Sequence, residues 1–137
     1  MPLKKKALCL VVALMTSGTM AVADSCWDHN GSMMRLQANG AQRWLTYDRP
    51  RQALWDAGVQ TGTLLFNGSN SGDWYSGTAR VFSRHCPGAP QEYFVEGPVL
   101  QNPLRILMRG TREVHKRCSP TGRWTEDTLV FIYRFAC

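Results

Sequence analysis

The chain has 137 residues, which is enough for one domain with a single hydrophobic core. Its formal net charge is +6, from 16 Lys and Arg against 10 Asp and Glu. Lys4, Lys5 and Lys6 supply three of those six charges, so the rest of the chain carries only +3. Because no dense basic cluster remains, the composition argues against a nucleic-acid-binding protein.

The N-terminus has the three parts of a secretory signal peptide. Lys4–Lys6 are basic, Ala7–Met15 form an apolar run with one cysteine, and residues 21–23 (AVA) match the small-residue cleavage site. We therefore predict a signal peptide over residues 1–23 and a single mature domain over residues 24–137, located in the periplasm or outside the cell. A membrane anchor would need about 20 apolar residues. Later apolar runs are shorter still, so no transmembrane segment is expected in the mature chain.

Cysteine spacing indicates two disulfides. Of five cysteines, Cys9 lies in the predicted signal peptide, which leaves Cys26, Cys86, Cys118 and Cys137. An even number of cysteines in a small exported domain is typical of a disulfide framework, and four allow three pairings. We favour Cys26–Cys137, which ties the chain ends together, with Cys86–Cys118, which joins two loops. A zinc site or reactive thiol is disfavoured because the spacing is wide and C-x-x-C is absent.

In the first half of the mature chain, short period-2 segments alternate with turn residues, which is typical of antiparallel strands. Residues 39–40 (NG) are a tight-turn signal, and Gly58 closes a helical turn. The polar residues 28–29 (DH) are interpreted as a turn before the first strand. We predict strands over Ser32–Ala38 and Ala41–Tyr47, a helical turn over Arg51–Ala57, and a strand over Thr63–Phe66.

The second half continues the same pattern. Asn67–Gly72 is predicted to be a loop. The strand after this loop contains Gly77, which is expected to break or bulge it. Further turns are predicted at Cys86–Pro90, at residues 97–98 and at Ser119–Gly122. The predicted strands are Trp74–Ser83, Glu92–Val95, Leu104–Arg109 and a final strand in which Leu129, Phe131, Tyr133 and Phe135 share one face.

These segments predict an all-β fold. Seven or eight strands at a spacing of roughly 8–12 residues, joined mainly by hairpins, indicate a small antiparallel meander barrel or sandwich. The pattern leaves the choice between barrel and sandwich open.

A search for catalytic and metal-binding patterns gives no candidate. His29, His85 and His115 are scattered without ligand spacing. Glu92 and Glu96 on one strand would lie roughly 13 Å apart, which is wide for a glycosidase carboxylate pair. We therefore predict no catalytic residue, no metal, no cofactor and no enzymatic activity.

Arginine and tryptophan are the residues most suggestive of a ligand surface. Twelve of the thirteen cations after residue 23 are arginine, which binds carboxylate and phosphate through a rigid fork. The candidate ligand-binding residues are Arg49, Arg51, Trp55, Trp74 and Arg80. Two alternatives stay open: the arginines form a solvated surface in a protein from a GC-rich genome, and the tryptophans fill the core.

Several segments also carry a resemblance to a known family. They are residues 28–36 (DHNGSMMRL), 47–51 (YDRPR), 62–66 (GTLLF), 75–79 (YSGTA) and 127–131 (DTLVF). Together they resemble an uncharacterised exported domain of rhizobia-like alphaproteobacteria, which some relatives carry attached to caspase-like peptidase domains. The resemblance spans nearly the whole mature chain and implies an accessory role in the envelope or outside the cell, with no implied catalytic residues.

Two function hypotheses follow. The first is a non-enzymatic binding module for an envelope polymer, a small ligand or a protein, with an anionic glycan or lipid among the possible partners. The alternative is an inhibitor of a hydrolase such as lysozyme, with Asn67–Gly72 as the loop that enters the active site. Small periplasmic barrels that inhibit lysozyme offer an analogy at the level of fold only.

Overall fold

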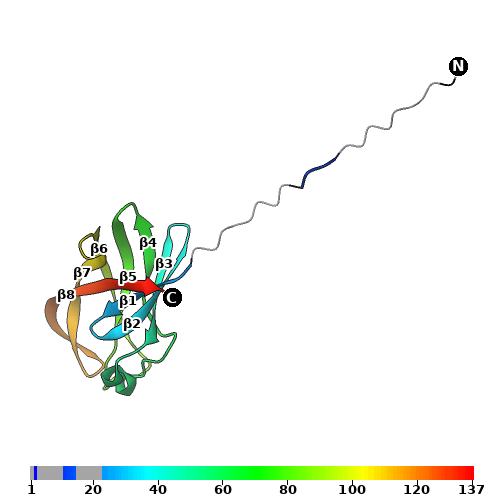
Figure 1. Cartoon of the computed structure of the whole chain (residues 1–137). Helices are drawn as coiled ribbons and strands as arrows, with labels where there is room; N and C mark the ends of the chain where they lie inside the picture. Colours follow the sequence, from blue (N-terminus) through cyan, green and yellow to red (C-terminus); the bar gives the residue numbers. More distant parts are fainter. Residues whose placement is uncertain (1, 3–10, 15–22) are drawn as a thin grey trace.

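A computed structural model describes Pro2, residues 11–14 and residues 23–137 (Figure 1). Most of the predicted signal peptide therefore lies outside the described residues. Within the described part of the chain, no helix has the length and apolar character needed to cross a membrane.

Residues 23–137 form a closed barrel of eight antiparallel strands (Figure 1). Each strand pairs with its neighbour in the chain, and the last strand pairs with the first, which confirms the all-β prediction and selects a barrel over a sandwich. A short 3-10 helix, η1, lies where a helical turn was predicted. The elements are β1 (Ser25–His29), β2 (Ser32–Asn39), β3 (Gln42–Arg49), η1 (Gln52–Ala57), β4 (Leu64–Ser71), β5 (Trp74–Val81), β6 (Gln91–Leu100), β7 (Arg105–Lys116) and β8 (Ser119–Ala136).

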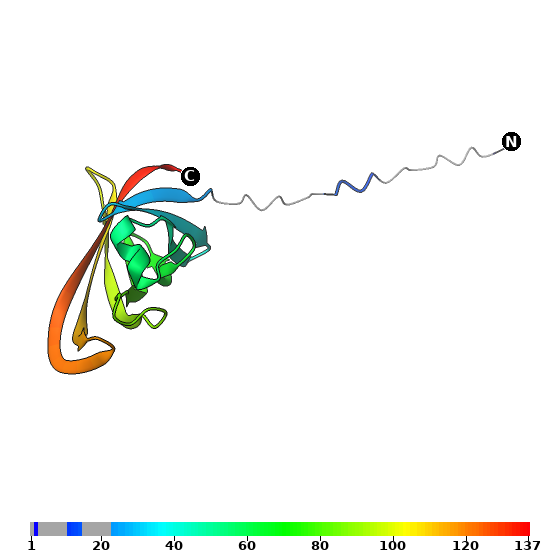
Figure 2. The ribbon, with the colours of Figure 1, turned by 90° about the horizontal axis from the view of Figure 1, so that it is seen from below.

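The up-and-down order gives the barrel two different ends. One end, which we call the mouth end, carries the β1–β2 turn, the β3–β4 connection with η1, the β5–β6 connection and the tip of the β7–β8 hairpin. The other, the terminal end, carries the remaining turns and both ends of the barrel chain. Figure 2 looks onto the mouth end, where η1 lies across the barrel and the β7–β8 hairpin extends past the barrel wall.

The core fills the barrel interior. Alternate residues of each strand point inward, so the period-2 pattern of the sequence becomes one buried cluster. Fully buried apolar side chains come from every strand from β2 to β8, and they include Met34, Leu45, Phe66, Ala79, Val95, Ile106, Met108 and Phe131. Burial of such side chains contributes about 1.5–3 kcal/mol each.

Glycine allows the strands to approach closely. Gly68 on β4 lies opposite Gly77 on β5, and a Cβ atom on Gly68 would overlap the carbonyl oxygen of Ser76. The predicted break at Gly77 is wrong, because β5 pairs without a register shift on both sides through this position. The missing side chain instead lets β4 come close, because a Cβ atom on Gly77 would overlap the carbonyl oxygen of Asn67.

Both predicted disulfides are confirmed. Cys26–Cys137 joins the start of β1 to the end of the chain, with Cα atoms 5.2 Å apart. Cys86–Cys118 joins the β5–β6 connection to the tip of the β7–β8 hairpin, with Cα atoms 5.4 Å apart. One bond therefore ties the terminal end, and the other ties two connections of the mouth end.

Four predicted turns are wrong because the strands continue through them. Asn67–Ser71 belong to β4, and the turn lies at residues 72–73. Residues with low strand propensity are held there because β3 and β5 pair with them on both sides. Residues 97–98 lie inside β6, Ser119–Gly122 begin β8, and residues 28–29 end β1.

Burial differences between two phenylalanines predict different effects on stability. Phe131 is 0 % exposed in the core, whereas Phe94 on β6 is 58 % exposed on the outer surface. We expect Phe131→Ala to lower the free energy of unfolding by about 3–5 kcal/mol. Phe94→Ala should change it by no more than about 0.5 kcal/mol. Urea denaturation of the oxidised protein measures both, and equal losses would contradict the assignment of Phe131 to the core.

Candidate functional site

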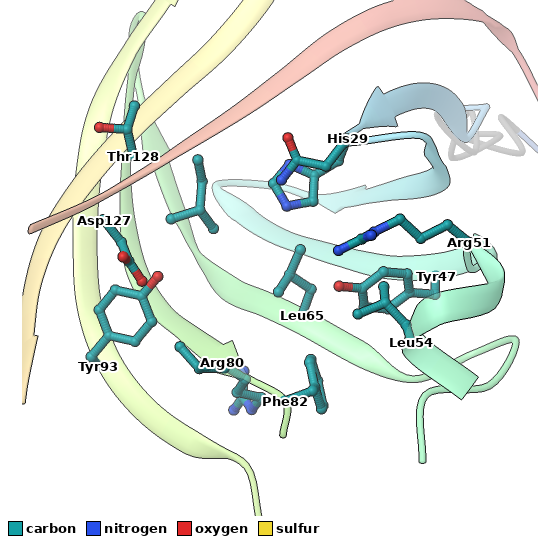
Figure 3. A pocket seen from close by; sticks show the side chains of 13 residues that line it. His29, Tyr47, Arg51, Leu54, Leu65, Arg80, Phe82, Tyr93, Asp127 and Thr128 are labelled. Atoms are coloured by element: carbon teal, nitrogen blue, oxygen red, sulfur yellow. The ribbon is translucent and has the colours of Figure 1, made fainter. Parts of the chain in front are cut away.

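A cavity of about 260 Å³ opens at the mouth end of the barrel (Figure 3). We call it the mouth cavity. Its walls come from segments far apart in the sequence: the β1–β2 turn, β3, the start of η1, β4, the end of β5, β6 and β8. Leu54, Leu65 and Phe82 provide apolar surface, and the remaining lining is largely polar.

His29 at the end of β1 is a buried polar group of the mouth cavity. Its ring stacks on Phe131, with centroids 4.4 Å apart, and Nδ1 lies 2.8 Å from the Val130 carbonyl oxygen. Burial lowers the pKa of His29 from 6.5, and the Arg51 charge adds to this, whereas Val130 and Asp28 act in the opposite direction. The neutral ring donates from Nδ1 to the carbonyl, so Nε2 is left as an acceptor.

Arg51 and Tyr47 face His29 from the η1 side. In Figure 3 the Arg51 side chain extends from the start of η1 toward His29, and the Tyr47 hydroxyl points into the same space. The Arg51 backbone N–H donates to Ser32 Oγ at 2.9 Å, which fixes where this side chain begins. Within residues 23–137 the Arg51 guanidinium has no ion pair. Burial raises the pKa of Tyr47 to about 12, so its hydroxyl stays protonated and can donate.

The opposite wall holds a carboxylate that is already engaged. Asp127 on β8 forms an ion pair with Arg112 of β7, and the Tyr93 hydroxyl of β6 points toward it (Figure 3). Burial raises the pKa of Tyr93, and the Asp127 charge raises it further. Asp127 is therefore a neutralised part of the wall rather than a free acid or base.

Cations outnumber acids on the connections of the mouth end. Asp56 is the one acidic residue in the connections that form the mouth end, namely residues 30–31, 50–63, 82–90 and 117–118. The unpaired cations on or beside these connections, among the residues that the structure describes, are Arg49, Arg51, Arg84, Lys116 and Arg117. The entrance therefore favours anionic molecules over cationic ones.

The predicted ligand-binding arginines lie in different environments. Arg51 and Arg80 both line the mouth cavity, and Arg49 is exposed at the end of β3 outside its lining. The Arg80 guanidinium is occupied, because it donates to Asn67 Oδ1 at 2.7 Å and lies 3.4 Å from Glu92 Oε1. Arg51 is thus the cation of this group that is free to meet a ligand in the cavity.

Neither of the two predicted tryptophans lines the mouth cavity. Trp55 is 64 % exposed on η1 and lines a separate hollow with Pro50 and Val59. Trp74 is 46 % exposed at the start of β5, near the terminal end, and lines a groove on the outer surface.

Sequence reasoning missed the other polar groups of the mouth cavity. The alternation of the strands could have identified three of them. Two residues before or after an inward-facing core residue on the same strand lie His29, Tyr47 and Tyr93, so their side chains also point inward. The sequence places His29 in a predicted turn, and no motif around Asp127 indicates a site residue.

No family model, curated protein or solved structure matches this chain. The described residues include no group of three or more His, Cys, Asp or Glu side chains that could hold a metal ion. What the site can do chemically therefore follows from its geometry: it can accept a small ligand that carries a negative charge, a hydrogen-bond donor and an apolar part.

Burial of His29 predicts a pH dependence of stability. The unfolded chain binds a proton at this residue near pH 6.5, whereas the folded protein binds it only at lower pH. The full contribution to stability is present above about pH 6.5 and is lost as the pH falls toward the lowered pKa. The free energy of unfolding, measured by urea denaturation, should therefore decline between pH 7.5 and pH 5. We expect His29→Gln to remove the part of this decline that comes from the histidine. His115→Gln, at an exposed site, is the matched control and should keep the wild-type decline.

Proposed function

We propose that this protein is an exported, non-enzymatic binding protein that holds a small anionic ligand in the mouth cavity. The observation that carries the proposal is Arg51: an unpaired guanidinium, within residues 23–137, that extends into a cavity beside a neutral histidine and a protonated tyrosine. The two disulfides and the N-terminal pattern support export.

The lining defines the chemistry of the ligand. Arg51 would bind a carboxylate or phosphate group through two parallel N–H···O contacts. His29 Nε2 accepts a hydrogen bond from a ligand hydroxyl or amide, and the Tyr47 hydroxyl donates one. Leu54 and Phe82 contact an apolar part of the ligand. A cavity of about 260 Å³ lies just below the range of drug-sized sites, about 300–1,000 Å³, and suits a compact acid such as a sugar acid.

The hydrolase-inhibitor alternative has less support from the fold. Its loop was predicted at Asn67–Gly72, but Asn67–Ser71 lie within β4, where Asn67–Ser69 pair with both β3 and β5 and the last two residues pair with β5. A segment held in this way has no free loop to insert into another protein's active site.

A pair of neighbouring arginines allows a matched test. We expect a panel of small acids, including N-acetylmuramic acid and citrate, to contain at least one that binds in isothermal titration calorimetry. Arg51→Gln should weaken that binding about tenfold or more, because a charge-assisted hydrogen bond is lost. Arg49→Gln removes the same charge two residues away, outside the cavity lining, and should change binding by less than about threefold through screening alone.

The same titration at higher salt checks the electrostatic part of the proposal. Raising sodium chloride should weaken binding to the wild type more than binding to Arg51→Gln. A panel in which no acid binds, or in which Arg49→Gln is as damaging as Arg51→Gln, would contradict a specific site in the mouth cavity.

A further inference from the structure

The outer surface of β5–β8 carries three large aromatic side chains that the barrel does not use for its core. Trp74 is 46 % exposed, Phe94 is 58 % exposed and Trp124 is 68 % exposed. Each lies on the outward side of its strand, next to a residue of opposite parity that is buried or faces the interior. This surface is separate from the mouth cavity, and we call it the aromatic face.

Strand register places the three rings on a diagonal across the aromatic face. Trp74 lies opposite Pro98 on β6, four residues from Phe94, and Trp124 lies opposite Glu113 on β7. With ~3.3 Å per residue and ~4.8 Å between strands, the step from Trp74 to Phe94 is roughly 14 Å. Trp124 lies two strands from Phe94, on the part of the β7–β8 hairpin beyond the β6–β7 pair of Glu96 and Arg109. The rings are therefore too far apart to form one continuous apolar patch.

Polar side chains fill the spaces between the rings. In the strand register, Thr78 lies opposite Phe94 and Glu96 lies opposite Arg109. Beside Trp74 the surface is hollowed into a groove of about 440 Å³, whose sides include Glu96, Arg109 and Leu107. A molecule lying along the diagonal would meet an aromatic ring, then hydrogen-bonding groups, then another ring.

We propose that the aromatic face binds a neutral glycan chain, with sugar rings stacked on Trp74, Phe94 and Trp124. A sugar ring has an apolar C–H face that stacks on an aromatic ring, and its hydroxyl groups bond to carboxylate, guanidinium and hydroxyl side chains. Protein partners instead favour aromatic side chains clustered in a dry centre. An extended polymer reaches separated rings one after another.

Charge separates this ligand from the one in the mouth cavity. The outward side of β5–β8 carries both signs of charge, Glu92, Glu96, Glu113 and Glu126 together with Arg80, Arg105 and Arg109. Glu92 is ion-paired with Arg80, and Glu96 lies opposite Arg109 in the strand register. A surface with nearly balanced charge has no net attraction for polyanions such as nucleic acids or phosphorylated glycans. A neutral chain does not need such attraction, because it binds through ring stacking and hydrogen bonds.

Tryptophan fluorescence titration with neutral hexasaccharides tests the proposal. The probes are chitohexaose, cellohexaose and maltohexaose, added to the oxidised protein, and at least one should bind. Trp74→Ala and Trp124→Ala should each weaken binding roughly two- to tenfold, because one stacking contact is lost. Trp124→Phe, which keeps a ring, should restore most of it. Trp55→Ala removes an exposed tryptophan from η1, away from this face, and should have no effect.

Further controls keep the outcomes distinct. Arg51→Gln should leave hexasaccharide binding unchanged, so the aromatic face and the mouth cavity succeed or fail separately. All the tryptophans concerned are exposed, so each variant is expected to keep the wild-type melting temperature. The proposal is overturned if none of the three hexasaccharides binds, if Trp55→Ala weakens binding as much as Trp74→Ala, or if only a protein partner depends on Trp74 and Trp124.

Discussion

Pairing between β1 and β8 is the interaction on which the rest of the structure depends. Ser25 lies opposite Ala136 and Asp28 lies opposite Ile132, so the first and last strands complete the barrel. This pairing gives every strand two neighbours and removes exposed edges. It also brings His29 against Val130 and Phe131, and so creates the floor of the mouth cavity. The core and the cavity both exist because the sheet closes on itself.

Charge is distributed unevenly over the closed barrel. Cations collect on the connections of the mouth end, where one acidic residue, Asp56, accompanies them. On the outward side of β5–β8, Glu92 is ion-paired with Arg80 and Glu96 lies opposite Arg109, so the charges there are nearly balanced. A net charge of +3 for residues 24–137 conceals this division. The two surfaces therefore differ in electrostatic character, which is why the proposals above assign them different kinds of ligand.

The features that could be predicted from the sequence are those that depend on local pattern. Period-2 alternation and the turn at residues 39–40 identified the β2–β3 hairpin, and Gly58 marked the end of η1. Cys26 and Cys137 could be paired because the ends of a small domain commonly meet. These features need only neighbouring residues, or the cysteines themselves, to be recognised.

The features that could not be predicted depend on pairing across the sheet. Asn67–Ser71 have the composition of a loop but are strand residues because both neighbours pair with them. The mouth cavity combines His29, Tyr47, Tyr93 and Asp127, which lie on four strands and carry no common motif. Which of their side chains meet depends on the register of a closed barrel, and composition does not specify that register.

The meander order has a consequence for how the chain folds. Seven of the eight strand pairings join segments that are consecutive in the chain, and such local hairpins can form as the chain emerges. The eighth joins residue 25 to residue 136, so β1 lacks its second partner until almost the last residue is available. An incomplete chain therefore remains an open sheet with two unpaired edges. Those two edges can pair with another chain until β8 is in place.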